Sequence, residues 1–267
     1  MKETSVRTLT AMVIIPIIFV CIKFLPSVLF SLLLYLIFSI VVYEFIKLCK
    51  PKTYSLLLIF IFGLIIASHF TFNQPDLLMS IMGIVFGFGL FFLFSIRKSE
   101  ELSAFIRDIG IHFLTVFYIY IPLYFIFKLR ELGVNYLFFL IFVILIGDSG
   151  AYFIGRWVGK HSIYPVASPK KTLEGLIAAI LTAAPAGWLA RLIFPIEVEI
   201  WKAILTGALI ALFSQLSDPI ESLFKRAANQ KDSGAILPGH GGFLDRLDSY
   251  IFCSPLLYYL ILFFWNA

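Results

Sequence analysis

The sequence predicts an all-α, polytopic integral membrane protein with about nine transmembrane helices. The first observation behind this prediction is composition, because 61% of the 267 residues are hydrophobic and only 14% are charged. Soluble domains carry about 25% charged residues. The second observation is patterning: apolar runs recur along the chain, and a spanning helix needs about 20 mainly apolar residues. The mean hydropathy of +0.98 agrees with both observations.

Nine apolar segments are long enough to cross a bilayer. We expect the first to be retained as a span, because no small-residue cleavage site follows it. The sixth contains Asp148 and the eighth ends at Asp218. In chain order the segments are residues 8–25, 27–46, 54–71, 77–96, 109–128, 134–154, 173–194, 201–217 and 249–265.

The distribution of basic residues predicts the orientation. With nine spans, 16 of the 21 Lys and Arg residues fall on the side of the N-terminus and 5 on the other. Cytoplasmic loops carry the excess of basic residues, so we expect a cytoplasmic N-terminus and an outside C-terminus in the cell (inner or plasma) membrane. Residues 1–140 are then N-terminal spans, and residues 141–267 form a second membrane region whose polar residues face the cytoplasm.

The first polar motif is GDSGAYFIGRWVGK, at residues 147–160. On a helix Asp148, Tyr152, Gly155 and Gly159 lie near one face. The two glycines are typical of close helix packing. An acid at membrane depth usually faces a cavity or a partner, so we expect Asp148 to belong to a site or to support one.

The second motif is SPKKTLEG, at residues 168–175. Ser168-Pro169 is a turn signal, and the two following lysines then lie beside the start of the seventh span. Lysines and helix N-termini both attract phosphate. Ordinary membrane anchoring by basic residues would explain the lysines equally well.

The third motif is SDPIESLFKR, at residues 217–226, in which Asp218, Glu221, Ser222 and Lys225 share one helical face. An amphipathic helix leaving the membrane shows the same pattern. Pro219 would free a backbone carbonyl one turn earlier, which a metal or substrate site could use. We therefore expect Asp218 to bind a metal.

The fourth motif is LPGHGGFLDRLD, at residues 237–248. Its glycines flank His240 and let the backbone approach a ligand closely; exposed N–H groups in such a loop can hold phosphate oxygens. Asp245 and Asp248 follow with helical i, i+3 spacing, and hard cations such as Mg²⁺ take carboxylate and phosphate oxygens. For His240 three roles stay open: general base, phosphate contact or loop hydrogen-bonding group.

At these residues the chain resembles the CDP-diacylglycerol synthases (phosphatidate cytidylyltransferases). The segments DSGAYFIGRWVGKH and SPKKTLEG are similar to that family as well. One departure is Ser217-Asp218-Pro219, where the family has Gly-Asp and a large hydrophobic residue. The signature is filled by Ser222, Lys225-Arg226, Lys231-Asp232, Gly234, Leu237-Pro238, His240-Gly241-Gly242, Asp245-Arg246 and Asp248.

The resemblance implies transfer of a cytidylyl group from CTP to phosphatidic acid, which gives CDP-diacylglycerol and pyrophosphate. It implies Mg²⁺, with a second cation left open, on Asp218, Asp245 and Asp248. The catalytic set is then Asp218, Lys225, Arg226, His240, Asp245 and Asp248. The substrate-binding set is Asp148, Ser168, Lys171, Lys231, Asp232, Gly239, Gly241, Gly242 and Arg246.

Two other activities remain as alternatives at this stage. A lipid or polyprenol kinase using CTP would need the same groups but would release a nucleoside diphosphate. An ion-coupled transporter would explain an intramembrane acid and broken helices, although the chain lacks internal repeats. We expect CTP, phosphatidic acid and membrane lipids as partners and no nucleic acid; a homodimer is left open.

Overall fold

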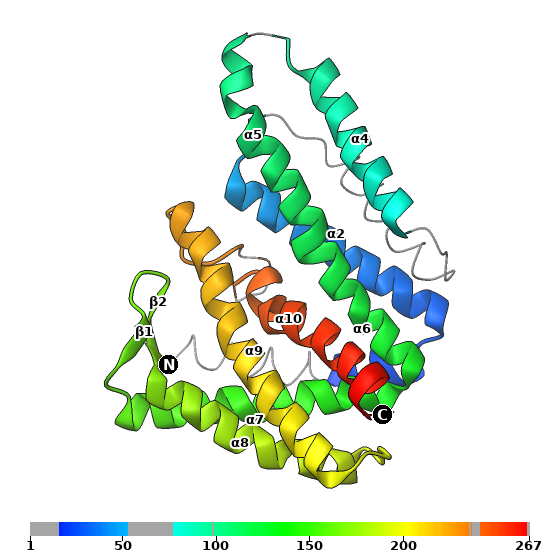
Figure 1. Cartoon of the computed structure of the whole chain (residues 1–267), viewed down its shortest axis with the longest axis vertical. Coiled ribbons are helices and arrows are strands. Elements are labelled where there is room, and N and C mark those ends of the chain that lie inside the picture. Colours follow the sequence, from blue (N-terminus) through cyan, green and yellow to red (C-terminus); the bar gives the residue numbers. More distant parts are fainter. Residues whose placement is uncertain (1–15, 53–76, 98, 235, 237–240, 266–267) are drawn as a thin grey trace.

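The computed structural model is a bundle of long helices with one small β-hairpin (Figure 1). It describes residues 16–52, 77–97, 99–234, 236 and 241–265. The N-terminal elements are α2 (Ser27–Cys49), α4 (Leu77–Ser95), α5 (Ser99–Leu114), the π-helical turn η1 (Thr115–Tyr120) and α6 (Ile121–Leu132). The remaining elements are α7 (Val134–Val158), β1 (Ser162–Tyr164), β2 (Ser168–Thr172), α8 (Leu173–Ile193), α9 (Ile200–Ala227), α10 (Leu244–Leu260) and the π-helical turn η2 (Ile261–Trp265).

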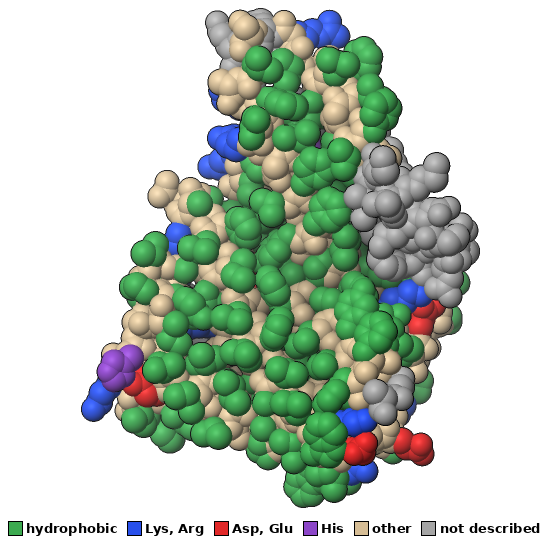
Figure 2. All heavy atoms as spheres, viewed as in Figure 1, with side chains coloured by type: hydrophobic (Ala, Val, Ile, Leu, Met, Phe, Trp, Pro, Cys, Tyr) green, Lys and Arg blue, Asp and Glu red, His purple; other side chains and the backbone are tan. Residues whose placement is uncertain are grey.

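Six helices in the described part are long and apolar enough to cross a membrane, and a shorter apolar helix covers Gly83–Ser95. They match the predicted spans from residue 27 onward, apart from 54–71, which lies outside the described residues. Of the predicted span 8–25, residues 16–25 are described, and residues 16–24 are helical. Figure 2 shows that the visible face is mostly hydrophobic, with few charged side chains. This surface fits a lipid environment, where only helices and closed barrels satisfy their backbone.

The all-α prediction is wrong between α7 and α8. There β1 and β2 pair antiparallel, with Ser162 opposite Thr172 and Tyr164 opposite Ser168. The turn lies at residues 165–167, so Ser168-Pro169 begins a strand instead of forming the turn. Proline is tolerated at the start of an edge strand, and a two-stranded hairpin has only edges.

Two helices are longer than the predicted spans. α9 continues past residue 217 to Ala227, and α10 begins at Leu244 instead of residue 249. The charged residues of these extensions did not end the helices, because several of them find partners between the two helices. Lys225 on α9, for example, pairs with Asp245 on α10.

Small residues bring α7, α8 and α9 close together. A Cβ atom on Gly155 of α7 would lie 3.3 Å from the Cα atom of Gly175 on α8. A Cβ on Gly147 would lie 3.3 Å from that of Ala183 and 3.5 Å from that of Ala211 on α9. The expectation that glycines of the 147–160 motif pack helices is therefore confirmed for Gly155. The close approach also lets the short side chain of Asp148 reach α9.

Candidate active site

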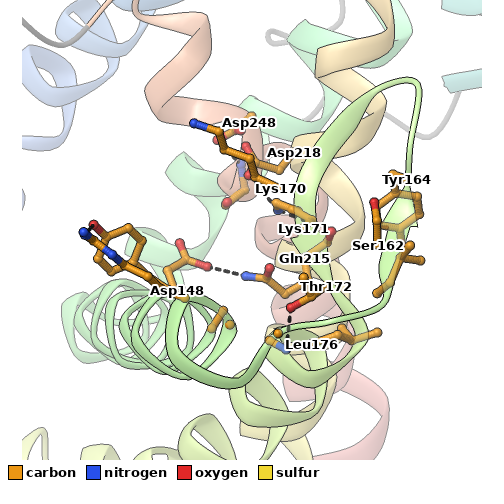
Figure 3. Close-up of a pocket in the computed structure, with 18 of the residues that line it drawn as sticks. Asp148, Ser162, Tyr164, Lys170, Lys171, Thr172, Leu176, Gln215, Asp218 and Asp248 are labelled. Carbon is orange, nitrogen blue, oxygen red and sulfur yellow. Dashed lines mark hydrogen bonds and ion pairs between the residues drawn. The ribbon is translucent and has the colours of Figure 1, made fainter.

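A cavity of about 1110 Å³ lies among α7, the hairpin, the first turns of α8 and α10, and the C-terminal half of α9. Figure 3 shows side chains from these elements converging on it. Its lining combines apolar residues of α7 with acids and with basic side chains. In the described part of the chain the acids are Asp148, Asp218, Asp245 and Asp248, and the basic residues are Arg156, Lys160, Lys170, Lys171 and Arg246.

Asp148 enters the cavity from the middle of α7. Its Oδ1 atom accepts hydrogen bonds from Gln215 Nε2 at 2.8 Å and from Ser214 Oγ at 3.1 Å. Tyr152, Gly155 and Gly159 line the same cavity, so the helical face predicted for this motif is confirmed. Asp148 thus connects α7 to α9 at the cavity wall (Figure 3).

Asp218 of α9 and Asp248 of α10 face each other. Their carboxyl groups are within hydrogen-bonding distance of each other, and both line the cavity. Asp248 is 5% exposed, whereas the Asp218 side chain is 45% exposed. Two facing carboxylates repel unless a proton or a cation lies between them. We call Asp218 and Asp248 the cavity pair.

Lys171 supplies a positive charge beside this pair. Its Nζ atom lies 2.6 Å from Asp218 Oδ2, and the residue is carried by β2 just before α8 begins. Thr172 fixes that helix start, because its hydroxyl accepts a hydrogen bond from the N–H of Gly175 at 3.2 Å. The hairpin and the cap of α8 together position Lys171 over α9.

Pro219 has the consequence predicted from the sequence, without breaking the helix. α9 runs through it to Ala227. Because proline lacks an N–H, the carbonyl of Gln215, four residues earlier, receives no helical hydrogen bond from residue 219. Lys171 Nζ lies 3.5 Å from that carbonyl oxygen. The departure from the family pattern at this position therefore leaves an acceptor that faces Lys171.

A second group of polar residues is buried behind the cavity pair. Lys225 Nζ contacts the carboxyl of Glu221 and lies 2.7 Å from Asp245 Oδ1. Asp245 Oδ2 accepts hydrogen bonds from Gly242 N at 2.8 Å and from Ser233 N at 2.9 Å. Both carboxyl oxygens of Asp245 thus have protein partners, although this residue also lines the cavity.

The other residues singled out from the sequence lie in different places. Arg246 lines the cavity, and so does Lys170, a lysine of the second motif. Gly241 has a φ of 81°, a left-handed conformation that favours glycine, and Gly242 supplies an N–H to Asp245. Four predicted residues do not line the cavity: the exposed Arg226, Lys231 and Asp232, and the partly buried Ser168. Gly239 and His240 lie outside the described residues.

Sequence reasoning missed Glu44 on α2. This buried acid accepts hydrogen bonds from Leu244 N at 2.9 Å and from Phe243 N at 3.2 Å. The available signal was a lone acid inside a predicted span, which is rare and usually has a partner. Nothing in the sequence indicated that the partner lies about 200 residues further along the chain.

Among the described residues, no three His, Cys, Asp or Glu side chains are grouped as a ready metal site. The cavity pair offers two carboxyl groups. Any cation held there would take its remaining ligands from water or from a substrate, as Mg²⁺ commonly does with phosphates.

Comparison with known proteins identifies the family of this chain. A model of the cytidylyltransferase family matches residues 5–264. A phosphatidate cytidylyltransferase of Staphylococcus epidermidis is 39% identical over 155 residues, which cover 58% of this chain and 60% of that protein. The enzyme of the same name from Staphylococcus saprophyticus is 34% identical over 172 residues, covering 64% of this chain and 66% of that protein.

A third relative, the phosphatidate cytidylyltransferase of Staphylococcus aureus, is 39% identical over 156 residues. Those residues cover 58% of this chain and 60% of that protein, so the chain matches somewhat under two thirds of the length of these relatives. The family model, in contrast, covers nearly the whole sequence, including every residue of the cavity. This chain therefore belongs to the cytidylyltransferase family.

Proposed function

We propose that this protein transfers the cytidylyl group of CTP to phosphatidic acid and releases CDP-diacylglycerol and pyrophosphate. The observation that carries the proposal is one cavity that combines the facing carboxyls of Asp218 and Asp248 with basic side chains. It lies among helices that could cross a membrane, where a lipid substrate resides. The name of the staphylococcal relatives, phosphatidate cytidylyltransferase, supports the same activity.

The proposed reaction joins two polyanions. A phosphate oxygen of phosphatidic acid forms a bond to the α-phosphorus of CTP. The bond from that phosphorus to the oxygen bridging to the β-phosphate breaks, and pyrophosphate leaves with the electron pair. The attacking phosphate is already anionic, so no base is required to create the nucleophile. The main barrier is charge repulsion, which positioned cations reduce.

The residues of the cavity suit that task. Lys171 Nζ lies 2.6 Å from Asp218 Oδ2. When substrate enters, Lys171 would exchange this carboxylate for a phosphate. Arg156, Lys160, Lys170 and Arg246 line the same space. In this proposal the basic side chains hold the triphosphate and the lipid phosphate in line. Asp148 accepts hydrogen bonds from Gln215 and Ser214, and these bonds hold α7 against α9 while the substrates are bound.

Mg²⁺ fits the cavity pair, because carboxylate and phosphate oxygens are its preferred ligands. Asp218 and Asp248 would hold the ion. When bound, it would neutralise phosphate charge and polarise the phosphorus under attack. Asp245 is the third acid of the predicted metal set. We propose for it a structural role instead, because Lys225, Ser233 and Gly242 already contact its two carboxyl oxygens.

We further propose nine spans, with the N-terminus and the polar cavity on the cytoplasmic side, where CTP is found. The support is the ratio of 16 to 5 basic residues between the two sides, because cytoplasmic loops carry the excess of Lys and Arg. The acyl chains would stay in the bilayer and approach along α7. There Leu145 lines the cavity and is also 52% exposed at the protein surface.

The test is pyrophosphate release by the detergent-purified protein given CTP, Mg²⁺ and phosphatidic acid, with each omitted in turn. Release that requires all three, with a cytidine-containing lipid formed, is the expected result. Release of CDP instead would favour a lipid kinase. Absence of turnover in folded protein would reject both enzymes and favour a transporter.

A further inference from the structure

Glu44 is a buried acid in a part of the chain to which the proposed chemistry gives no role. It lies on α2, within the predicted span 27–46, and is 2% exposed. It does not line the cavity. A carboxylate buried among apolar helices is costly unless it is well hydrogen-bonded, so its partners indicate what it does.

Those partners are at the start of α10. Oε2 accepts a hydrogen bond from the N–H of Leu244 at 2.9 Å, and Oε1 accepts one from the N–H of Phe243 at 3.2 Å. The first N–H groups of a helix have no partner within it. The N-cap residue of α10, Phe243, supplies no side-chain cap. Glu44 therefore caps α10 from a different helix.

The same carboxylate reaches the site through Ser233. The Ser233 hydroxyl lies 3.2 Å from Glu44 Oε2 and 3.0 Å from Asp245 Oδ2. Asp245 in turn lies 2.7 Å from Lys225 Nζ. A continuous path of polar contacts thus runs from α2 to α10 and on to α9.

Two glycines make room for this carboxylate. A Cβ atom on Gly234 would lie 2.5 Å from Glu44 Oε1, and one on Gly242 would lie 2.5 Å from Oε2. Real Cβ atoms do not approach other atoms so closely. The backbone directly after Ser233 and directly before α10 is therefore fitted around the carboxylate of Glu44.

We propose that Glu44 is a positioning residue, which sets the place and direction of the start of α10 and thereby aligns Asp245 and Asp248 with α9. Its effect on turnover rests on the proposed function; its effect on α10 does not. Because Glu44 does not touch the cavity, it should act on kcat and leave the KM for CTP nearly unchanged.

The experiment replaces Glu44 with Gln, which keeps the size but removes one acceptor and the charge. Two quantities are measured in detergent: hydrogen–deuterium exchange at the amides of Phe243 and Leu244, and pyrophosphate release. We expect exchange at these amides to be about tenfold faster and kcat to be about tenfold lower, the size expected for loss of charge-assisted hydrogen bonds. KM for CTP should stay within about twofold.

The matched control is Glu131→Gln, because Glu131 is exposed on α6 and pairs only with nearby Lys128 among the contacts described. It should alter neither quantity. If Glu44→Gln does not fold, Gly234→Ala serves instead, since its methyl group pushes the Glu44 carboxylate away without removing it. It should also speed exchange and lower kcat.

Unchanged exchange at Phe243 and Leu244 in the folded variant would overturn the proposal, and so would a wild-type kcat. A change confined to KM would overturn it as well. If the wild-type protein releases no pyrophosphate at all, the proposed function fails, and the exchange measurement still decides whether Glu44 holds α10.

Discussion

Asp245 and Asp248 lie one turn apart on α10, yet they belong to two groups of polar residues that differ in their surroundings. The inner cluster, made of Glu44, Glu221, Lys225, Ser233 and Asp245, is buried and held by internal ion pairs and hydrogen bonds. The cavity pair, Asp218 and Asp248, has carboxyls that face each other, with Lys171 as the adjoining cation. The contacts of the inner cluster indicate a structural role, whereas the cavity pair is arranged to receive a cation or a phosphate.

The difference teaches that residue type and spacing do not assign a role. Asp245 and Asp248 are three residues apart, so both point to the same side of α10. Asp245 lies one turn nearer the helix start, where Gly242 and Ser233 present N–H groups. Asp248 lies one turn deeper, opposite Asp218. Substitutions at the two positions should therefore fail in different ways.

The largest effect is expected for the cavity pair. Asp218→Asn and Asp248→Asn should each lower pyrophosphate release roughly a thousandfold, because each removes a charge from the place where phosphates and a cation would meet. The Asp218 side chain is 45% exposed, so Asp218→Asn should leave the melting temperature nearly unchanged. Turnover assays together with thermal unfolding in detergent measure both.

Glu199→Gln is the control for this pair, since Glu199 is an exposed acid just before α9. It should retain wild-type turnover. Activity within about tenfold of wild type for both Asn variants would contradict the role of the cavity pair in charge neutralisation.

Asp245→Asn is expected to lower both the stability of the fold and the turnover, by less than the loss of turnover in the cavity-pair variants. Breaking a buried ion pair costs about 3 kcal/mol of unfolding free energy when one charge is left behind; here Lys225 retains only Glu221 as an acidic partner among the described residues. Turnover should fall roughly a hundredfold as α10 loses its alignment. A melting temperature equal to that of wild type, with turnover abolished, would instead make Asp245 part of the cavity pair's chemistry.

Much of the helical framework could be predicted from the sequence, because a bilayer demands runs of about 20 apolar residues. The hairpin could not, since strands of three and five residues carry too little alternation to be recognised. The helical spacing in the extra turns of α9 and α10 was recognised, but the predicted spans stop at residue 217 and start at residue 249, because the charged residues lie beyond the apolar runs. Lys225 of α9 and Asp245 of α10 instead form a buried ion pair between the two helices.

The site was predictable to the extent that its residues are close in sequence. The face of Asp148, Tyr152 and Gly155 follows from helical spacing alone. The link from Glu44 to Leu244 does not, because it joins residues 200 positions apart and depends on how α2 packs. Two partners of Asp245 were hidden for a different reason: they are the backbone N–H groups of Ser233 and Gly242, and every residue except proline carries such a group.

A third and smaller effect separates two neighbouring lysines. Lys171 contacts Asp218 at 2.6 Å, whereas Lys170 lines the cavity with an exposed side chain. Lys171→Ala should raise the KM for CTP about tenfold through loss of one charge-assisted contact. Lys170→Ala, the comparison variant, should raise it less, by about threefold, because the charge of this exposed side chain is more strongly screened by solvent. Equal effects of both variants would mean that the lysines act only as general positive charge.

The smallest effect is expected for Pro219→Ala, which tests what the cavity pair needs from its helix. The new N–H can bond to the carbonyl of Gln215, which Lys171 approaches at 3.5 Å, so that contact is lost while the ion pair with Asp218 remains. A contact this long contributes little, and turnover should fall by no more than about twofold. A loss beyond about tenfold in kinetic assays of folded protein would mean that the free carbonyl itself belongs to the site. The cavity pair would then depend on backbone geometry as closely as the inner cluster does, and the contrast between the two groups would narrow to burial alone.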